Sequence, residues 1–472
     1  MPDMPRDLPR ILIGAFRGGS GKSLLSLGIV ASLRSRGQRL AVFKKGPDYI
    51  DAAWLSRAAG VPCFNLDTYL MGERGVCNSF LRRTAGVDLA VVEGNRGLFD
   101  GADVEGSHSS ATLAKLVGLS VFLVIDCTKS TRTLAALVKG CQTMDPEIGI
   151  QGVILNQVAN SRQEAVIRAS IQSHCGVPVL GALPRISELR FPERHLGLFP
   201  PNEHGEADET IQFIREAVEQ YVDVERTVSL AAEHAALWDG PSDTQAEMAV
   251  SVASPGAFSG VRIGVVRDQA FHFYYPENIE ILREGGAEIL ELDASRETGL
   301  PLVDALYIGG GFPETHAEAL SENRSFLQSL RDAVEAGLPV YAECGGAVYL
   351  GKGLQWRGEF HPFSGIFPIV YELHDRPKGH GYTLLDVEGN NPFFPRGIRL
   401  KGHEFHYSGV LEWQEKDLQF ACRVKKGYGF DGSREGLWYR NVYATFSHLH
   451  ALGEPHWADY FLTRAASQAA EV

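Results

Sequence analysis

The segment ILIGAFRGGSGKS at residues 11–23 combines glycines, a lysine and a serine in a spacing that suits phosphate binding. Its glycines let the backbone curl so that successive N–H groups face phosphate oxygens. Lys22 would add a positive charge for the β- and γ-phosphates, and the hydroxyl of Ser23 could ligate Mg²⁺. A short apolar run precedes the loop and a helix-period run follows it. The sequence therefore predicts a nucleotide-phosphate site formed by Arg17, Gly18, Gly19, Ser20, Gly21, Lys22 and Ser23.

The loop departs from the plain G-x-x-x-x-G-K-[ST] pattern, because Phe16 stands where the first glycine belongs. It resembles the variant loop of MinD-, ParA- and dethiobiotin-synthetase-like ATPases, with Arg17 in place of their signature lysine. The resemblance implies ATP as the ligand. Because such ATPases often pair across the nucleotide, we expect a homodimer in which Arg17 reaches toward the second subunit. A chance glycine-rich turn is disfavoured, because a strand and a helix both flank the loop correctly.

A second reactive centre is predicted at Cys344, within LPVYAECGGAVYLGKGL at residues 338–354. This run reads as a strand over Pro339–Tyr341, a turn over Glu343–Gly346 and then a helical pattern. A cysteine on a sharp turn between a strand and a helix is typical of a nucleophile elbow, and the helix N-terminus is expected to lower the pKa of the thiol. The alternative, a buried structural cysteine, is disfavoured by a glycine run that follows an upstream strand. We expect an oxyanion hole formed by backbone N–H groups of Gly310, Gly311 and Gly345.

A cysteine nucleophile requires a base, and the chain offers 15 histidines. His448 and His450 lie in YATFSHLH, after a strand-like run near the C-terminus. A cysteine followed by a late histidine is the order of class I glutamine amidotransferases, so we predict His448 as the base. Those enzymes usually carry H-x-E here, and the orienting third role therefore falls to His450 or to no residue. His403 and His406 are the other candidates for the base, although structural or substrate-facing roles suit them better.

Acidic and amide side chains follow several predicted strands of the first half of the chain. Alternating strands and helices predict a parallel sheet that binds ligands at the carboxyl ends of its strands. Asp48 and Glu93, with Ser23, are the predicted Mg²⁺ ligands, because Mg²⁺ prefers oxygen ligands. Asn156 could read an adenine edge or only form a turn. The predicted strands are Leu40–Lys45, Leu89–Gly94, Val121–Asp126, Gly152–Gln157 and Pro178–Leu183.

Length and composition set further limits. With 472 residues, 44% of them hydrophobic and 22% charged, the chain is expected to form two or three globular domains. We predict a nucleotide-binding domain at residues 1–225, a linker at 226–259 and a second domain at 260–472. A net charge of −13 argues against nucleic-acid binding, and no apolar run approaches the ~20 residues of a membrane span. The polar N-terminus favours the cytoplasm, and seven scattered cysteines indicate neither disulfides nor a zinc site.

Long motifs in a fixed order resemble the cobyrinic acid a,c-diamide synthase family over almost the whole chain. They are FKKGPDYIDAAW (43–54), NLDTYLM (65–71), VVEGNRGLFDG (91–101), LPRISELRFPERHLGL (183–198), DQAFHFYYPENIEIL (268–282), GGGFPE (309–314), YAECGG (341–346), KGHEFHYS (401–408) and FSHLH (446–450). The resemblance implies an α/β protein with an N-terminal P-loop, parallel-sheet domain that binds ATP and a tetrapyrrole. It implies a C-terminal, flavodoxin-like glutamine amidotransferase domain that hydrolyses L-glutamine.

The resemblance also implies residue roles and a reaction. Tyr49, Ile50 and Asp51 are expected to bind the tetrapyrrole, and Asp100 to act in its activation beside Glu93. ATP would phosphorylate a carboxylate of the macrocycle, and ammonia released from glutamine would attack the acyl phosphate.

Family membership does not fix the macrocycle, since relatives amidate hydrogenobyrinic acid, nickel sirohydrochlorin or sirohaem. Two departures matter: Arg17 and Ser23 differ from the loop of many diamide synthases, and His380 stands where Phe or Leu is usual. Amidation of sirohaem or nickel sirohydrochlorin is therefore the alternative. A MinD-like ATP-dependent switch with an inactive second domain is an alternative of another class, disfavoured because Cys344 and His448 are both present.

Overall fold

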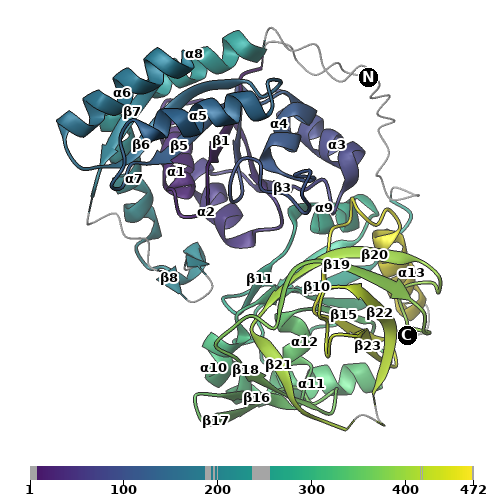
Figure 1. Ribbon diagram of the computed structural model, residues 1–472. Helices are drawn as coiled ribbons and strands as arrows, with labels where there is room; N and C mark the ends of the chain where they lie inside the picture. The colour runs from purple at the N-terminus through teal and green to yellow at the C-terminus, as the bar shows by residue number, and fades with distance from the viewer. Residues whose placement is uncertain are drawn as a thin grey trace. The chain divides into compact units, whose positions relative to one another are not determined.

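The computed structural model describes residues 8–186, 193–194, 197–198, 200–235, 256–414, 416 and 418–469. These residues form two compact units (Figure 1). The first contains the described residues up to 235 except 69–71, and the second contains 69–71 and the described residues from 256 onward. None of the helices in these ranges has the length and apolar content of a membrane-spanning segment.

The first unit is built on a parallel sheet of seven strands in the order β3-β2-β4-β1-β5-β6-β7. The five strands expected downstream of the phosphate loop are present close to their predicted limits, and β3 is an additional short strand. The strands are β1 (Arg10–Ala15), β2 (Leu40–Lys45), β3 (Cys63–Leu66), β4 (Leu89–Glu93), β5 (Ser120–Asp126), β6 (Ile150–Val158) and β7 (Val179–Pro184), with a small separate pair β8 (Glu193–Arg194) and β9 (Gly197–Leu198).

Among the described residues, six helices connect these strands, as the alternating pattern predicts for a parallel sheet, and the last three helical elements of the unit follow its final strand. In chain order, the helical elements are α1 (Lys22–Ser35), α2 (Tyr49–Ala59), α3 (Gly72–Thr84), α4 (Ser110–Val117), α5 (Thr133–Met144), α6 (Ser161–Cys175), η1 (Pro201–Glu203), α7 (Ala207–Tyr221) and α8 (Val224–Ala235).

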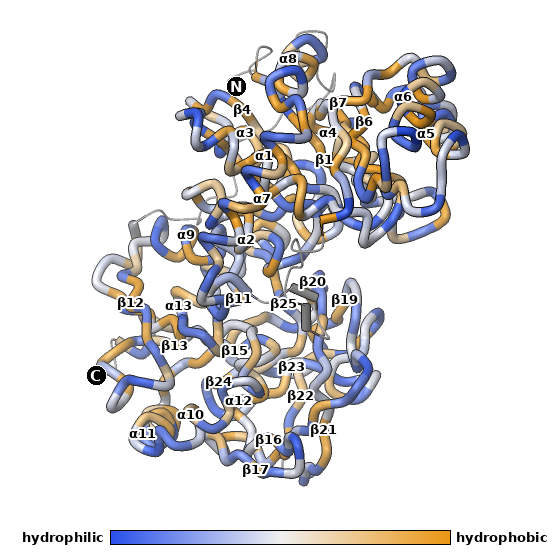
Figure 2. The backbone as a smooth tube through the Cα atoms, turned by 90° about the vertical axis from the view of Figure 1, so that its left-hand side faces the viewer, coloured by the Kyte–Doolittle hydropathy of each residue, from blue (hydrophilic) through white to orange (hydrophobic). Residues whose placement is uncertain are grey.

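The core of the first unit explains why its strands are continuous apolar runs. One face of β1, with Ile11 and Ile13, packs against α1, α2, α7 and α8, and both isoleucines are fully buried. Figure 2 shows hydrophobic residues along the strands around β1 and β6. A strand that lies between two parallel neighbours and under helices has no solvent-facing side, so alternation of polar and apolar residues is lost.

The expected linker at residues 226–259 begins too early. Helix α8 extends to Ala235, and its buried residues Leu230 and Ala231 belong to the core of the first unit. An amphipathic helix that buries one face in a core cannot serve as a linker. Residues 236–255 of the expected linker lie outside the described residues.

The second unit is built on a mixed sheet of ten strands in the order β12-β10-β13-β15-β24-β23-β22-β19-β20-β25. The half from β12 to β24 is parallel, and the half from β24 to β25 is antiparallel. Its strands are β10 (Arg262–Val266), β12 (Glu288–Leu292), β13 (Ala305–Ile308), β15 (Val340–Glu343), β19 (Gly379–Val387), β20 (Arg399–His406), β22 (Gln419–Lys426), β23 (Arg434–Tyr439), β24 (Val442–Thr445) and β25 (His448–Leu449).

Smaller elements surround this sheet. They are the pair β11 (Phe271–Phe273) and β14 (Gly310–Gly311), the sheet of β16 (Gly353–Trp356), β17 (Glu359–Pro362), β18 (Ile369–Leu373) and β21 (Ser408–Trp413), and the helices α9 (Pro276–Glu284), η2 (Pro313–His316), α10 (Ala317–Glu322), α11 (Arg324–Glu335), α12 (Gly345–Tyr349) and α13 (Trp457–Ala469).

Two hydrophobic clusters cover the two faces of the parallel half. One contains Val340 and Ala342 with residues of α11, and the other contains Tyr341 and Tyr443 with residues of α9 and α13. Successive residues of β15 therefore point to opposite faces, as in any strand. The strand continues two residues beyond the expected end at Tyr341, so that Glu343 is its last residue and not part of the turn.

Candidate functional site

The predicted phosphate loop lies between β1 and α1, and Lys22 is the first residue of the helix. Gly21 precedes it with φ of 97°, a left-handed conformation that favours glycine. A Cβ atom at Gly21 would also lie 2.2 Å from Nδ2 of Asn156, so a larger residue requires a shift. Nζ of Lys22 donates to the carbonyl oxygens of Arg96 at 2.8 Å and Arg17 at 3.4 Å. The lysine therefore folds back across the loop that it follows.

Asn156 contacts the phosphate loop through its amide group. Its Nδ2 donates to the carbonyl oxygen of Ser20 at 2.9 Å, and its Oδ1 accepts from the N–H of Gln157 at 3.0 Å. The structure therefore shows Asn156 holding the phosphate loop through its side-chain amide, and its contact with an adenine edge stays a prediction. Arg17, also expected at the nucleotide, has a largely exposed side chain that donates to Oδ2 of Asp126 at 2.9 Å.

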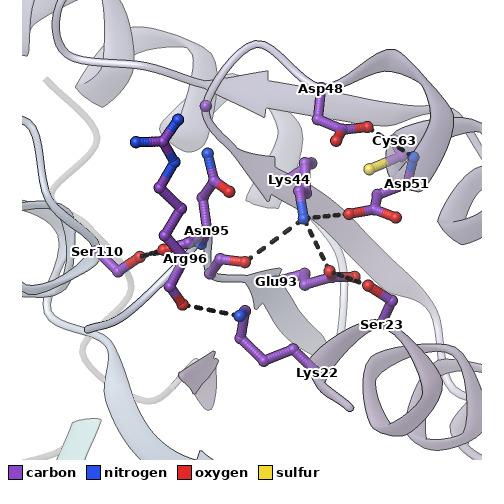
Figure 3. A network of polar contacts seen from close by, with 12 residues as sticks. Lys22, Ser23, Lys44, Asp48, Asp51, Cys63, Glu93, Asn95, Arg96 and Ser110 are labelled. Atoms are coloured by element: carbon purple, nitrogen blue, oxygen red, sulfur yellow. Dashed lines mark hydrogen bonds and ion pairs between the residues drawn. The ribbon is translucent and has the colours of Figure 1, made fainter. Parts of the chain in front are cut away.

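Lys44 is the centre of a buried network of charges at the carboxyl ends of β2 and β4 (Figure 3). Its Nζ lies 2.6 Å from Oδ2 of Asp51 and 2.8 Å from Oε1 of Glu93. Ser23 donates its hydroxyl to the same oxygen of Glu93 at 2.8 Å. Lys44 and Glu93 face each other in register on neighbouring parallel strands, which explains their approach. Burial alone would lower the pKa of Lys44, but Asp51 and then Glu93 more than offset it, and the pKa is raised.

Glu93 presents an oxygen that suits a cation. Its Oε2 is buried and has no hydrogen-bond partner among the described residues, and burial raises the pKa of Glu93 to about 7. Within the described ranges, no group of three or more His, Cys, Asp or Glu side chains is arranged to hold a metal ion. Mg²⁺ at this point would therefore need Ser23, phosphate oxygens and water as further ligands, which is its usual mode of binding.

Asp48, the other expected ligand, is placed differently. Its Oδ1 accepts the N–H of Asp51 at 2.8 Å and caps the N-terminus of α2. Burial raises the pKa of Asp48 to about 6. Asp51, three residues further on in the first turn of α2, contacts Lys44, and Asp48 as a Mg²⁺ ligand stays a prediction.

The residues expected to bind the tetrapyrrole and the one expected to act in its activation occupy two positions in the first unit. Tyr49 and Ile50 start α2, and Ile50 packs against the hydrophobic core. Asp100 is exposed, and its Oδ2 accepts the N–H of Gly97 at 2.8 Å. Asp100 also lines a cavity of about 410 Å³, together with Arg96, Ser109, Thr112 and Lys115.

The predicted nucleophile Cys344 forms the sharp turn between β15 and α12. Its backbone has φ of 49° and ψ of −104°, a strained conformation for a residue other than glycine. Its N–H donates to the carbonyl oxygen of Thr445 at 2.7 Å, which fixes the turn against β24. Burial, and then the negative charge of Glu314, raises the pKa of the thiol. The expectation of a lowered pKa is wrong, because the thiol is enclosed and α12 has only five residues.

The glycine loop lies against this turn. Gly346 donates its N–H to the carbonyl oxygen of Gly309 at 3.1 Å, and a Cβ atom at Gly345 would lie 3.1 Å from the backbone nitrogen of Gly311. Gly311 itself has φ of 154°, and a Cβ atom there would lie 2.0 Å from the carbonyl oxygen of Ala270. The amides of Gly311 and Gly345 thus come close together beside the cysteine, an arrangement suited to the predicted oxyanion hole.

His448 lies between the glycine loop and a carboxylate. Its Nδ1 is 3.2 Å from Oε2 of Glu343, and only 2% of the histidine and 1% of the glutamate is exposed. On the other edge of the ring, a Cβ atom at Gly310 would lie 2.5 Å from Cε1 and 3.2 Å from Nε2. The structure therefore brings the cysteine turn, the glycine loop and His448 together.

His450, one of the two alternatives for the third role, points elsewhere. Its Nε2 lies 3.6 Å from Oε2 of Glu277, and its ring packs against Tyr275 with centroids 4.5 Å apart. His403 stacks on the ring of His448 at 5.0 Å, and burial lowers its pKa well below the ordinary value. A neutral, buried His403 fits the expected structural role.

Three residues of these sites were missed in the sequence. Lys44 lies at the end of a predicted strand, and nothing local indicates which side chains it meets. Glu343 directly precedes the cysteine, and the sequence pattern assigns it to the turn. Tyr274 holds the glycine loop, because its hydroxyl accepts the N–H of Gly309 at 2.7 Å and donates to the carbonyl oxygen of Val266.

Comparison with protein families identifies both parts of the chain. Residues 11–199 match the CobQ/CobB/MinD/ParA nucleotide binding domain, and residues 262–456 match the CobB/CobQ-like glutamine amidotransferase domain. The protein therefore joins a nucleotide-binding domain of the P-loop type to a glutamine amidotransferase domain, and the predicted α/β fold class is confirmed.

Curated relatives match nearly the whole chain. The cobyrinate a,c-diamide synthase of Magnetococcus marinus is 43% identical over 97% of this chain and 97% of its own. Those of Archaeoglobus fulgidus, at 36% over 98% of both chains, and of Listeria monocytogenes, at 35% over 93% of this chain and 96% of its own, are also similar. The chain belongs to the cobyrinate a,c-diamide synthase family.

Proposed function

We propose that the protein catalyses the ATP-dependent amidation of the a and c acetate carboxylates of cobyrinate, with L-glutamine as the nitrogen donor. The observation that carries this proposal is the 43% identity to a cobyrinate a,c-diamide synthase over 97% of both chains. The proposal is also supported by the juxtaposition of Lys22, Ser23 and Glu93 in one unit and of Cys344 and His448 in the other.

In the glutaminase step, Nε2 of His448 takes the thiol proton while Sγ of Cys344 attacks the carboxamide carbon of glutamine. The developing oxyanion accepts hydrogen bonds from the backbone N–H groups of Gly311 and Gly345. Collapse of the tetrahedral intermediate releases ammonia, with the proton returned by His448, and leaves a thioester on Cys344. Water then attacks the thioester with His448 again as base, and glutamate leaves.

In the synthetase step, the phosphate loop and Lys22 hold the β- and γ-phosphates of ATP. Lys44, which keeps its charge inside the protein, holds Asp51 and Glu93 in place. Mg²⁺ bound at Ser23 and Glu93 would supply charge neutralisation at the transferred phosphoryl group. A substrate carboxylate attacks the γ-phosphorus and gives an acyl phosphate and ADP. Ammonia then attacks the acyl carbon, and phosphate leaves as the amide forms.

Mass spectrometry of the products tests the proposal. The protein would be incubated with ATP, Mg²⁺ and glutamine against cobyrinic acid, hydrogenobyrinic acid, sirohaem and nickel sirohydrochlorin in separate reactions. Each amidation replaces a hydroxyl by an amino group, so the mass counts the amides. Two amides on cobyrinic acid support the proposal. Amidation of sirohaem or nickel sirohydrochlorin alone would assign the other substrate and leave the mechanism intact.

Cys344→Ser is the matched control for the two half-reactions. This variant is expected to lose glutamate release and glutamine-dependent amidation, but to keep amidation driven by ammonium. The serine is nearly isosteric and leaves the turn in place. Loss of the ammonium-driven reaction would contradict the assignment of separate centres.

We also propose a homodimer formed across the nucleotide, with Arg17 as the reaching residue. Its side chain is 71% exposed, and its ion pair with Asp126 lies at the surface. A surface ion pair contributes little free energy, so Arg17 can leave Asp126 for another partner at little cost. Sedimentation velocity with and without a non-hydrolysable ATP analogue would test this. A monomer under both conditions would contradict it.

A further inference from the structure

Glu343, the residue directly before the nucleophile, presents its carboxylate to His448 at 3.2 Å, in a chain that has His450 in place of the glutamate of an H-x-E motif. We infer that Glu343 is the positioning residue for His448, and that it completes a Cys-His-Glu arrangement from within strand β15. The inference rests on the proposed glutaminase step, and it names the group that holds the base in its working state.

Glu343 accepts hydrogen bonds at both carboxylate oxygens. Its Oε2 lies 3.2 Å from Nδ1 of His448 and accepts the hydroxyl of Tyr307 at 3.2 Å. Its Oε1 accepts the hydroxyl of Tyr341 at 3.1 Å and the N–H of Leu449 at 3.2 Å. A buried carboxylate with donors on both oxygens is held in one orientation.

Strand pairing explains why this glutamate reaches the histidine. In the parallel half of the sheet, β15 pairs with β13 on one side and with β24 on the other. Tyr341 lies in register with Tyr307, and Glu343 lies two residues further along the same face of β15. His448 follows shortly after the end of β24. The glutamate therefore lies at the carboxyl end of its strand, with tyrosines below it and His448 beside it.

The two tyrosines act as fixed donors. Burial, and then the negative charge of Glu343, raises the pKa of Tyr307 and of Tyr341 well above the ordinary value. Both hydroxyls therefore stay protonated throughout the working pH range. Because a phenol hydroxyl can give its proton to only one acceptor, each tyrosine directs its proton to Glu343.

This arrangement sets the proton on His448. A carboxylate only accepts, so the proton of the neutral imidazole sits on Nδ1 and Nε2 is left free to accept. Nε2 lies on the ring edge that faces the glycine loop, which itself packs against the cysteine turn. When Nε2 takes the thiol proton, the imidazolium lies beside Glu343 and is stabilised by it. This matters here because burial raises the pKa of Cys344 and makes the thiol a reluctant donor.

His450 cannot fill the same role in this structure. Its ring is directed to Glu277 at 3.6 Å and to Tyr275. An imidazole also lacks the carboxylate that would hold the Nδ1 proton of His448. The third position is therefore filled from the strand of the nucleophile and not from the strand of the base.

Glutaminase kinetics of Glu343→Gln in the full-length protein test the inference. The amide is isosteric but can donate to Nδ1, which favours the tautomer with the proton on Nε2. We expect kcat for glutamate release to fall about 10²–10⁴-fold with KM for glutamine changed by less than about threefold. The acidic limb of the kcat/KM profile is expected to move to lower pH, because the imidazolium loses its anion. Glu343→Asp should recover part of kcat.

Two further variants separate positioning from folding. His450→Gln is expected to keep the wild-type acidic limb and to change kcat by less than about threefold, because it leaves the contact of Glu343 untouched. Tyr341→Phe removes one donor from Glu343 without loss of volume, and should lower kcat and move the acidic limb in the same direction as Glu343→Gln. Tyr341→Phe therefore keeps the inference testable if Glu343→Gln does not fold.

Each of the following results would overturn the inference. Glu343→Gln with wild-type kcat and pH profile would overturn the inference alone, as would a loss that lies wholly in KM. A larger effect of His450→Gln than of Glu343→Gln would overturn it in favour of His450. A wild-type protein that forms amide from ammonium but releases no glutamate from glutamine would overturn the proposed glutaminase function, and the inference with it.

Discussion

Replacement of Lys44 by methionine should lower the free energy of unfolding of the first unit. The size of this loss should depend on pH. Lys44 is 2% exposed and lies within 2.8 Å of both Asp51 and Glu93, so Lys44→Met leaves the buried carboxylate of Glu93 and the partly buried carboxylate of Asp51 without a cation. Removal of one partner from a buried ion pair costs about 3–5 kcal/mol. Glu93 can relieve part of this by protonation, because burial already raises its pKa to about 7. The cost should therefore be larger at pH 8 than at pH 6.

Peptide-resolved hydrogen exchange is the suitable assay, because a chain of two units does not unfold in one step. Each loss of about 1.4 kcal/mol in the free energy of unfolding raises the unfolding equilibrium constant tenfold. Backbone amides of β2 and β4 should therefore exchange about 10²- to 10³-fold faster in Lys44→Met than in the wild type at pH 8. Peptides of the second unit provide an internal reference within the same sample. Lys115→Met is the matched control, because Lys115 is 40% exposed and pairs with Asp145 at 2.7 Å at the surface, where such pairs contribute about 0–1 kcal/mol.

A double variant isolates the interaction itself. In Lys44→Met with Glu93→Gln, the second substitution removes the unpaired charge, so the combined cost should be smaller than the sum by about 1–3 kcal/mol. Equal exchange in Lys44→Met and the wild type, or additivity within about 0.5 kcal/mol in the double variant, would refute the view that Lys44 is held by charge and not by packing.

Three further substitutions have defined outcomes. Tyr274→Phe removes the hydroxyl that accepts the N–H of Gly309 at 2.7 Å, and should lower kcat for glutamate release at least about tenfold while ammonium-driven amidation is kept. Gly21→Ala introduces a Cβ atom 2.2 Å from Nδ2 of Asn156, at a residue with φ of 97°, and so strains the loop by about 1–3 kcal/mol. Calorimetry should therefore show that the affinity for ATP falls at least about tenfold. An unchanged affinity would contradict the loop assignment. Burial raises the pKa of Glu435 to about 8, so the native state binds this proton more tightly than the unfolded chain, and stability falls by roughly 1.4 kcal/mol per pH unit between about pH 4.5 and 8. Glu435→Gln lacks this loss, so urea unfolding of the second unit at pH 5 and pH 8 should show the variant gaining on the wild type as pH rises.

Local patterns in the sequence were sufficient for the parts of both sites that lie on one short segment. The phosphate loop joins a strand to a helix through six consecutive residues, so its glycines, Lys22 and Ser23 could be assigned without any long-range information. Cys344 could be placed on its turn for the same reason. The parallel arrangement of the first sheet, though not its strand order, could be predicted from alternating helices and continuous apolar strands buried on both faces.

Contacts between distant segments could not be predicted in the same way. Glu343 meets His448 only because β15 and β24 are neighbours, although about a hundred residues separate them, and a sequence pattern does not specify which strands pair. Asp51 contacts Lys44 while Asp48 caps α2, and the sequence does not specify which of the two carboxylates takes which role. The sequence predicts a lowered thiol pKa from the adjacent helix, but α12 has only five residues and the turn is buried, so the pKa of Cys344 is raised.

Both sites place a buried carboxylate from the end of one parallel strand against a basic group supplied by the neighbouring strand or just beyond it. Glu93 meets Lys44 in the first unit, and Glu343 meets His448 in the second. Burying such a pair is a poor source of stability, because the lost hydration of two charges roughly cancels their attraction. What each pair does fix is a protonation state: Lys44 remains a cation beside Glu93, and His448 keeps its proton on the nitrogen that faces Glu343. A hydrophobic pair of equal volume would fold as well and could do neither, so the two carboxylates are better explained by the chemistry of their partners than by the stability of the sheet.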